Sequence, residues 1–252
     1  MANGCGSRGN RKITMITFDK VTKKFPLGNT ALNDVSFEID DNQFVFLVGQ
    51  SGAGKTSILK MITQEIKPTS GSIIVDDFDV TDKNFSQQID LRRKIGIIFQ
   101  DFKVLADKNV FENIAVSLKV IGADQLDIKT EVKKTLELVG LSKKEFVFPV
   151  QLSAGELQRV AIARALAKEP KILLLDEITS SLDVESVKGI LQLIKKLSKT
   201  HRTMIVVTHQ IHFAREIANR IIFLDKGSIV AAGSPLEILH SSRNLRIKQF
   251  LA

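Results

Sequence analysis

An eight-residue stretch, GQSGAGKT at positions 49–56, constrains the fold more than any other part of this sequence. It matches the pattern G-x-x-x-x-G-K-[ST], in which glycines let main-chain N–H groups turn inward around phosphate oxygens. The apolar run FVFLV at 44–48 precedes it, and a helical pattern over 57–66 follows. Strand, glycine turn and helix in this order predict a phosphate site at a helix N-terminus, inside an α/β fold.

Two residues of this stretch have predicted roles of their own. Lys55 is expected to reach the β and γ phosphates of a nucleotide, and the Thr56 hydroxyl is expected to bind Mg²⁺. The structural alternative is a plain glycine turn between a strand and a helix. The eight matching positions, with a buried strand before them and a helix after them, favour the phosphate site.

A magnesium nucleotide needs a second acidic anchor, and ILLLDE at 172–177 supplies one. An apolar strand there would deliver Asp176 at its carboxyl end, where open α/β sheets place ligands. Asp176 is predicted to hold the metal, and Glu177 to polarise the attacking water as a general base. Taken alone, the two acids would indicate only a helix N-terminal cluster. His209 follows the strand pattern at 204–208 and is expected to contact the γ phosphate.

The stretch LSAGELQRV at 152–160 opens a helical pattern that continues to 167. Ser153 and Glu156 have the S-x-x-E spacing of a capping box, in which each side chain bonds the other residue's main-chain N–H. The capping box is a sufficient structural explanation. A helix N-terminus also attracts phosphate, so the residues alone leave both interpretations open.

Apolar periodicity predicts strands that alternate with helices, and therefore a parallel sheet. Strands are expected at 16–18, 35–39, 44–48, 72–75, 95–99, 172–175, 204–207 and 221–224. Helices are expected at 57–66, 110–120, 128–139, 152–167, 184–197 and 211–218. Residues 101–159 carry few strand patterns and are expected to form a helical subdomain inserted between core segments 15–100 and 160–252, after a flexible leader at 1–14.

Composition narrows the choice of partners. The net charge is +8, but the basic residues are spread along the chain, which favours a solvated surface or a nearby membrane over a nucleic-acid site. No apolar run approaches the ~20 residues that span a bilayer, so any membrane span is expected to come from another chain. The single cysteine, Cys5, excludes an intrachain disulfide and fits a reducing cytosol.

The ordered set of motifs resembles the ATP-binding subunits of ABC (ATP-binding-cassette) transporters over residues 15–252. The set comprises GQSGAGKT, the Gln100 of IIFQ, LSAGE, ILLLDE, SSLD at 180–183 and the His209 of VTH. The resemblance implies an α/β P-loop NTPase core with a parallel sheet, an antiparallel β edge and an inserted helical subdomain. It also implies hydrolysis of ATP with Mg²⁺ by a homodimer that forms head to tail around ATP.

The resemblance assigns further roles position by position. Phe25 falls where an aromatic ring stacks on adenine, and Gln100 matches a glutamine that touches Mg²⁺ and senses the membrane partner. LSAGE matches a motif that binds the γ phosphate held by the other subunit, and SSLD matches a loop that signals between subunits. The implied nucleotide-binding residues are Phe25, Gly49, Gln50, Ser51, Gly52, Ala53, Gly54, Lys55, Thr56, Ser57, Ser153, Ala154, Gly155, Glu156 and Asp183. The implied catalytic residues are Glu177, His209 and Gln100, and the implied metal ligands are Thr56, Gln100 and Asp176.

Two residues depart from the family pattern. Ala154 stands where glycine is usual, and its methyl group would narrow the approach to phosphate and disfavour a positive φ. Ile178 stands where proline is common. Neither change removes a catalytic group, so slower but real hydrolysis is expected.

Two groups within the family share features with this chain. FVFLVGQSGAGKT, LRRKIGIIFQDFKVL and DKNVFENIA resemble FtsE, the cell-division ATPase that pairs with the membrane protein FtsX. The stretch from 212 onward resembles ATPases of polar amino-acid importers. The segment after the Q-loop glutamine faces the membrane partner in this family, so the FtsE-like interpretation is preferred and the importer is the alternative. An FtsX-like protein or a permease is then expected at the cytoplasmic face of the membrane, in a groove lined by Asp101, Phe102, Val104 and Leu105.

Other classes of protein are disfavoured. No N-K-x-D motif for guanine is present, which argues against a GTPase. No long coiled coil interrupts the chain, which argues against a DNA-repair ATPase, and no nucleic acid is expected as a partner. In the FtsE-like interpretation, ATP binding signals through a membrane protein without moving a solute. In the importer alternative, a solute crosses the membrane.

Overall fold

The computed structural model describes residues 13–26, 28–208, 211–240 and 247. Most of the predicted leader, Cys5 and His209 lie outside the described residues. The strands are β1 (Thr14–Lys24), β2 (Thr30–Asp40), β3 (Phe44–Val48), β4 (Ser70–Val75), β5 (Phe78–Asp79), β6 (Ile95–Ile98), β7 (Ile172–Asp176), β8 (Thr203–Val207), β9 (Arg220–Asp225) and β10 (Ser228–Gly233). The α-helices are α1 (Lys55–Ile62), α2 (Gln88–Lys94), α3 (Val110–Val120), α4 (Gln125–Val139), α5 (Ala154–Leu166), α6 (Val184–Leu197), α7 (Ile211–Ile217) and α8 (Pro235–His240). Two short 3-10 turns are η1 (Ser142–Lys144) and η2 (Pro149–Gln151).

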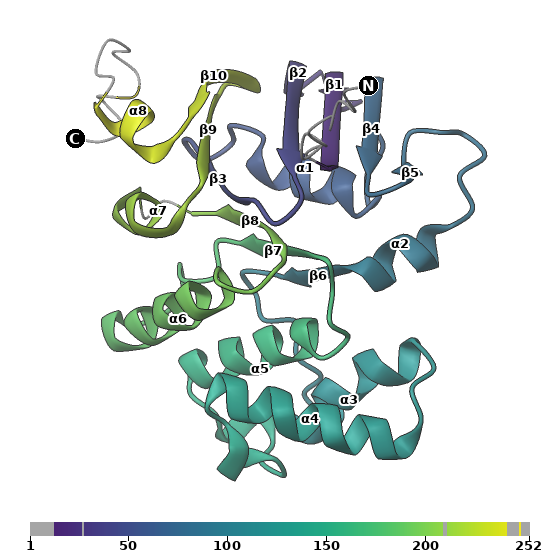
Figure 1. Ribbon diagram of the computed structural model, residues 1–252, viewed down its shortest axis with the longest axis vertical. Coiled ribbons are helices and arrows are strands. Elements are labelled where there is room, and N and C mark those ends of the chain that lie inside the picture. The colour runs from purple at the N-terminus through teal and green to yellow at the C-terminus, as the bar shows by residue number, and fades with distance from the viewer. Residues whose placement is uncertain (1–12, 27, 209–210, 241–246, 248–252) are drawn as a thin grey trace, which may run out of the picture.

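A six-stranded sheet runs through the centre of the molecule in the order β10-β9-β3-β8-β7-β6 (Figure 1). Five of its strands are parallel, and β10 joins β9 antiparallel. Parallel strands bring their carboxyl ends to one edge of the sheet, where ligands bind. The glycine turn after β3 and the acids after β7 therefore lie at the same edge, with β8 between the two strands. The predicted parallel sheet is confirmed.

A second, four-stranded sheet has the order β2-β1-β4-β5 and is antiparallel throughout. The rings of Phe18 in β1 and Phe37 in β2 stack with their centroids 4.5 Å apart. Both side chains belong to the hydrophobic core that this sheet shares with α1. This sheet is the antiparallel β edge that the family resemblance implies.

β3 is packed on both faces, which explains why its sequence is apolar at every position. All five of its residues are buried. Phe44 and Phe46 belong to a core shared with α3–α6, while Val45 and Leu47 belong to the core that contains α1 and the antiparallel sheet. Side chains alternate between the two faces of a strand, so a strand covered on both sides needs no polar residue.

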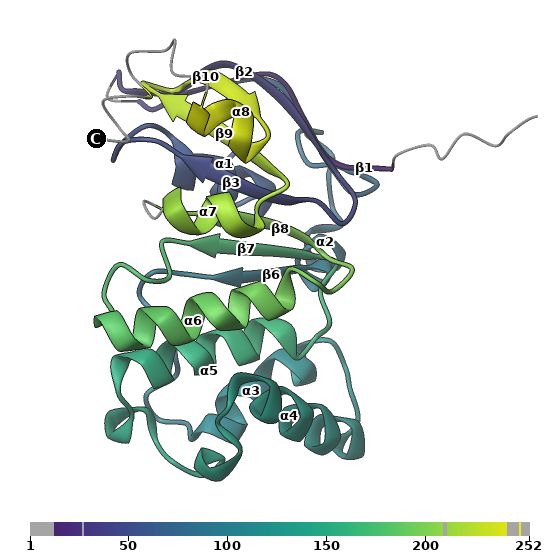
Figure 2. The ribbon, with the colours of Figure 1, turned by 60° about the vertical axis from the view of Figure 1, so that its left-hand side comes forward.

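The helices α3, α4 and α5 gather at the lower end of the molecule, on the opposite side of the large sheet from α1 (Figure 2). They correspond to the predicted helical subdomain, but its predicted end at 159 falls inside α5, a continuous helix. The second half of α5 packs on β6, where a Cβ added to Gly96 would lie 3.0 Å from the carbonyl oxygen of Ala165. α5 therefore belongs to the helical layer and to the core at once.

Helix α1 ends earlier than the predicted 66. Gln64 takes a left-handed conformation with φ 56°, and the Glu65 N–H donates to the Lys60 carbonyl at 2.8 Å, which closes the helix. Ile66 packs against the core from the following loop, so its apolar side chain resembled one more helical turn. The sequence patterns also missed α2, in which Leu91 is the buried residue, and the short elements β5, β10 and α8.

Candidate active site

The turn between β3 and α1 depends on glycines at two close approaches. Gly49 has φ 151°, and a Cβ there would lie 2.1 Å from the carbonyl oxygen of Leu224 in β9. Gly54 caps α1 with φ 104°, and a Cβ there would lie 2.5 Å from the carbonyl oxygen of Ala31 in β2. The loop is thus pressed against two neighbouring strands, and α1 starts directly behind it.

Replacing Gly49 by alanine is expected to destabilise the protein much more than the same change at Gly52. At Gly49 the methyl group overlaps the Leu224 carbonyl, so strain and overpacking together cost about 3 kcal/mol or more. Gly52 has φ 78° and open space around it, so alanine costs about 1 kcal/mol there. Equilibrium unfolding in urea measures both free energies. Equal losses would contradict the close approach of the loop to β9.

Lys55, the first residue of α1, is 4% exposed and lies back against the glycine loop. Its Nζ donates to the carbonyl oxygens of Gly49 at 2.8 Å and Gln50 at 2.9 Å. Burial lowers the pKa of Lys55, and the negative charges of Glu177 and Asp176 work in the opposite direction. The Nζ lies 4.0 Å from Glu177 Oε1. The loop's own carbonyls therefore hold the ammonium group within the turn that the motif predicts to bind phosphate.

Asp176 ends β7, and its carboxylate lies against the start of α1. The Thr56 hydroxyl donates to Asp176 Oδ1 at 3.3 Å. Burial raises the pKa of Asp176, the hydrogen bond from Thr56 lowers it, and the charge of Glu177 raises it further. Hydroxyl and carboxylate oxygens side by side are the kind of ligand that Mg²⁺ prefers. The structure thus brings together two of the predicted metal ligands.

Glu177 follows β7 in a left-handed conformation, with φ 47°. Its N–H donates to the Val207 carbonyl at 3.0 Å, at the end of β8. Its own carbonyl accepts hydrogen bonds from the Ser180 N–H at 3.1 Å and the Ser180 hydroxyl at 2.9 Å. Positive φ costs a non-glycine residue about 1 kcal/mol or more, and it persists only where the surroundings enforce it. The main chain on both sides of Glu177 is therefore fixed.

A cavity of about 330 Å³ opens over the glycine loop. Its lining residues are Phe25, Asn29, Ala31, Ser51, Gly52, Gly54, Lys55, Thr56, Ser57, Gln100 and Glu177. The Phe25 ring is partly exposed, and Lys23 Nζ lies 5.2 Å from its centroid. A second cavity of about 690 Å³ shares Thr56 and Gln100 and adds Asp176. Asn29 and Ala31 were missed in the sequence, because their place in the site comes from the fold of β1 and β2 and from no motif.

The predicted capping box at the start of α5 is confirmed. The Glu156 N–H donates to Ser153 Oγ at 3.3 Å, and the Ser153 N–H donates to Glu156 Oε2 at 3.0 Å. Lys144 forms an ion pair with Glu156 at 2.5 Å. The hydrogen bonds from Lys144 and then from Ser153 lower the pKa of Glu156. The Glu156 carboxylate thus has structural partners in its own chain.

The methyl group of Ala154 meets no conflict with its own backbone. Ala154 is the first residue of α5 and is not among the residues with positive φ. The next residue is the one with no room for a side chain: a Cβ added to Gly155 would lie 2.4 Å from Ser186 Oγ of α6. The Ser186 hydroxyl donates to Asp183 Oδ2 at 2.7 Å, and Asp183 caps α6. The N-termini of α5 and α6 therefore pack closely against each other where Gly155 meets Ser186.

The predicted site residues fall into two groups. One group forms the glycine loop and the two cavities beside it. The other group lies at the N-termini of α5 and α6. Among the described residues, its members do not line the cavity over the glycine loop. They are Ser153, Ala154, Gly155, Glu156 and Asp183. His209 lies outside the described residues.

Known proteins share this fold. Residues 32–180 match the model of the ABC transporter family. The chain is 39% identical over 241 residues to the methionine import ATP-binding protein MetN of Histophilus somni (strain 129Pt), a match that covers 94% of this chain and 70% of that relative. The dimeric ATP-binding cassette MJ0796, in a post-hydrolysis state with ADP and Pi, is similar with a TM-score of 0.80 and 33% identity, over 88% of this chain and 99% of that one. CbiO1 from Clostridium perfringens, part of the transporter complex CbiONQ, gives a TM-score of 0.83 and 25% identity, over 95% of this chain and 99% of that one.

The chain belongs to the ABC transporter family. It is an ATP-binding cassette that hydrolyses ATP, on the P-loop NTPase fold of that family. Across the ranges that the structure describes, no helix is both long enough and apolar enough to cross a bilayer. The similarity to a methionine import ATP-binding protein supports the importer alternative over the FtsE-like interpretation.

Proposed function

We propose that this chain is the ATPase subunit of an ABC importer for methionine or a related amino acid, and that it works with a separate membrane permease. The observation that carries the proposed ATP site is a single cavity that gathers Lys55, Thr56, Gln100 and Glu177 over a glycine loop. The solute class is supported by the 39% identity to a methionine import ATPase over nearly the whole chain. The resemblance of the C-terminal part to amino-acid importers points the same way.

In this proposal the nucleotide lies in the cavity with its phosphates on the glycine loop. Lys55 faces the β and γ phosphates, and Phe25, in the lining of the same cavity, stacks on adenine. Mg²⁺ fits the oxygen atoms of Thr56 and Asp176, with the Gln100 amide oxygen as a further ligand. The ion would neutralise phosphate charge. The chain would hold these three oxygen ligands close to the buried ammonium group of Lys55.

Glu177 is the proposed general base. Its carboxylate borders the cavity and lies within ion-pair distance of Lys55, so it can accept a proton from a water molecule next to the γ phosphate. The strained main chain at Glu177 keeps this carboxylate at the end of β7. His209 is proposed to contact the same phosphate, on sequence grounds alone.

The second half of the proposed site comes from another copy of the chain. The N-terminus of α5, with Ser153 and Gly155, does not line the cavity over its own glycine loop. A helix N-terminus attracts phosphate, and the similar cassette MJ0796 has been solved as a dimer with ADP and Pi. We therefore propose a head-to-tail homodimer in the ATP state, with the α5 N-terminus of one copy on the γ phosphate of the other.

Changing Ala154 to glycine is expected to raise ATP turnover severalfold. The methyl group stands on the first residue of α5, at the helix end proposed to meet the phosphate, and its removal widens that approach. Glycine costs a helix about 0.5–1 kcal/mol, so a small loss of thermal stability accompanies the gain. Phosphate release at saturating Mg-ATP measures the rate. An unchanged rate would show that this methyl group does not tune hydrolysis.

The membrane permease is proposed to dock on residues 101–105, at the cytoplasmic face. Asp101 and Leu105 are exposed, and Asp101 and Phe102 line the larger cavity together with Gln100. A contact at this segment would therefore reach a proposed magnesium ligand directly. The cassette would then be a peripheral subunit whose membrane spans lie in another chain.

The FtsE-like function in cell division is the second candidate, favoured by the stretch IFQDFKVL at 98–105. The source organism separates the two functions when the chromosomal copy carries Glu177→Gln. The importer proposal predicts that uptake of labelled methionine falls at least tenfold while cell length stays normal. Normal uptake with filamentous cells would contradict the importer and support the division function.

A further inference from the structure

Two consecutive residues shortly after Gln100 adopt left-handed backbone conformations. Phe102 has φ 55° and Lys103 has φ 52°. The Lys103 N–H donates to the Asp101 carbonyl at 2.5 Å. A left-handed conformation costs an ordinary residue about 1–2 kcal/mol, and two in succession are held only by their surroundings.

The side chain of Arg164, in α5, holds this turn. Its Nη1 donates to the Lys103 carbonyl at 2.6 Å, and its Nη2 donates to the Phe102 carbonyl at 3.2 Å. Burial lowers the pKa of Arg164, and no charge from the described residues offsets this effect. A partly buried guanidinium with no carboxylate partner among the described residues is costly, and here two main-chain carbonyls accept hydrogen bonds from it. The hydrogen bonds from Arg164 therefore fix the main chain at Phe102 and Lys103, and they do not pair the guanidinium with an opposite charge.

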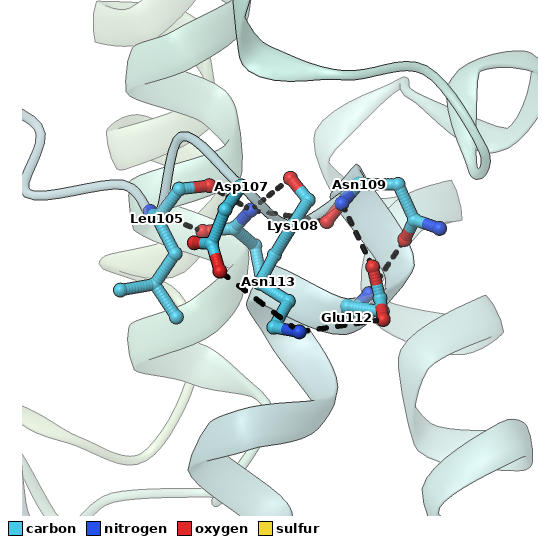
Figure 3. A network of polar contacts seen from close by, with 6 residues as sticks. All are labelled: Leu105, Asp107, Lys108, Asn109, Glu112 and Asn113. Atoms are coloured by element: carbon cyan, nitrogen blue, oxygen red, sulfur yellow. Dashed lines mark hydrogen bonds and ion pairs between the residues drawn. The ribbon is translucent and has the colours of Figure 1, made fainter.

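Asn113 of α3 fixes the rest of the segment (Figure 3). It is fully buried, and its Oδ1 accepts a hydrogen bond from the Leu105 N–H at 2.7 Å. Its Nδ2 donates to the carbonyls of Leu105, Lys108 and Asn109 at 3.0, 2.9 and 3.0 Å. The backbone of 102–109 is thus held from α5 on one side and from α3 on the other. The exposed side chains at its start belong to Asp101, Lys103 and Leu105.

Helix α5 connects this segment to the proposed phosphate site of the second subunit. Arg164 lies ten residues beyond Ala154, which is about 15 Å along an α-helix. No glycine or proline interrupts the helix after Gly155, so its two ends move together. One turn beyond Arg164, Lys168 Nζ donates to the Arg92 carbonyl of α2 at 2.5 Å. The last turn of α5 and the chain just after the helix are therefore each bound to main-chain carbonyls outside α3, α4 and α5.

We propose that Arg164 is a positioning residue that transmits ATP binding at the N-terminus of α5 to residues 101–109. When the γ phosphate of the other subunit attracts the N-terminus of α5, the whole helix shifts toward it. Arg164 shifts with the helix, and its two hydrogen bonds move the left-handed turn at Phe102 and Lys103. The exposed side chains of 101–105 then change position relative to the membrane partner. This inference rests on the proposed function, because it takes LSAGE as the phosphate site and 101–105 as the docking segment.

Hydrogen–deuterium exchange with mass spectrometry tests the inference without a permease or a solute. The parent protein is the full chain carrying Glu177→Gln, with and without Mg-ATP. ATP is expected to slow exchange in peptides covering 153–157 and 101–109. Adding Arg164→Met keeps a long side chain but removes both donors. We expect the slowing at 153–157 to remain and the slowing at 101–109 to disappear, while exchange of 101–109 without ATP rises about tenfold. Arg164→Lys, with one remaining ammonium donor, should recover part of the ATP effect.

Arg159→Met is the matched control. Arg159 lies on the same helix, donates to the Val139 carbonyl at 2.9 Å at the end of α4, and lies close to Gly189 of α6, so neither contact involves residues 101–109. The inference is overturned if Arg164→Met keeps the ATP effect at 101–109, or if Arg159→Met removes it equally. A parent protein without any ATP effect at 153–157 would instead refute the proposed phosphate site, and the inference with it.

Discussion

Glu177→Gln is expected to lower ATP turnover by about 10²–10⁴-fold, the range that a general base contributes. The amide has nearly the same shape as the carboxylate but cannot take a proton from water. The left-handed main chain and its hydrogen bonds with Val207 and Ser180 do not involve the side chain, so the fold should be unchanged. Phosphate release at saturating Mg-ATP measures the loss, and ATP binding by calorimetry should remain.

Glu185→Gln provides the control for this prediction. Glu185 is an exposed acid in the first turn of α6, away from the cavity, so its turnover should match that of the unmodified chain. If Glu177→Gln kept turnover within about tenfold of the unmodified chain, another group would have to be the base.

Lys55→Met is expected to weaken ATP binding by about 10–150-fold, since hydrogen bonds to charged groups contribute about 1.5–3 kcal/mol. Lys55 is the buried cation of the glycine loop, and methionine keeps its length without its charge. Burial lowers the pKa of Lys55, which means that the charged ammonium group is less favourable in the folded chain than in the unfolded chain. At any pH below the folded-state pKa, the charged side chain therefore lowers the free energy of unfolding of the nucleotide-free protein. Its removal relieves that cost and offsets the two lost hydrogen bonds to loop carbonyls.

Calorimetric titration with Mg-ATP measures the affinity, and chemical unfolding without nucleotide should change by less than about 1 kcal/mol. Lys188→Met, an exposed position in α6, makes the same change in net charge and should leave the affinity unaltered. Equal affinities for Lys55→Met and Lys188→Met would show that Lys55 does not meet the phosphates.

The sequence predicted the elements whose signal is local. β3, α3 and α6 have the bounds that the apolar patterns indicate, because a strand buried on both faces or an amphipathic helix leaves a strong periodicity. α2 left a weak signal, since Leu91 is its buried residue, and β10 is half-buried along most of its length. The end of α1 depends on the left-handed Gln64, which no pattern of apolar residues marks.

The candidate site shows the same division between local and long-range causes. The motifs indicated Lys55, Thr56 and Asp176 because their chemistry is confined to short stretches. The contacts that position them join distant segments, such as the approach of Gly49 to the Leu224 carbonyl, and no local motif marks them. Arg164 was missed for the same reason: in sequence it is one polar residue in an alanine-rich helix, and only the fold sets it against residues 102–103.

Each ATP site is proposed to be shared between two copies of the chain, and mixing two defective variants tests this sharing. Lys55→Met removes the phosphate contact of the glycine loop. Ser153→Asp keeps a residue that can cap α5 but places a negative charge where the other copy's γ phosphate is proposed to bind. Each variant alone should hydrolyse little ATP. Turnover is expected to reappear on mixing, because a mixed dimer pairs the intact loop of one chain with the intact α5 N-terminus of the other. Mixtures no more active than the separate variants would contradict a site shared between chains.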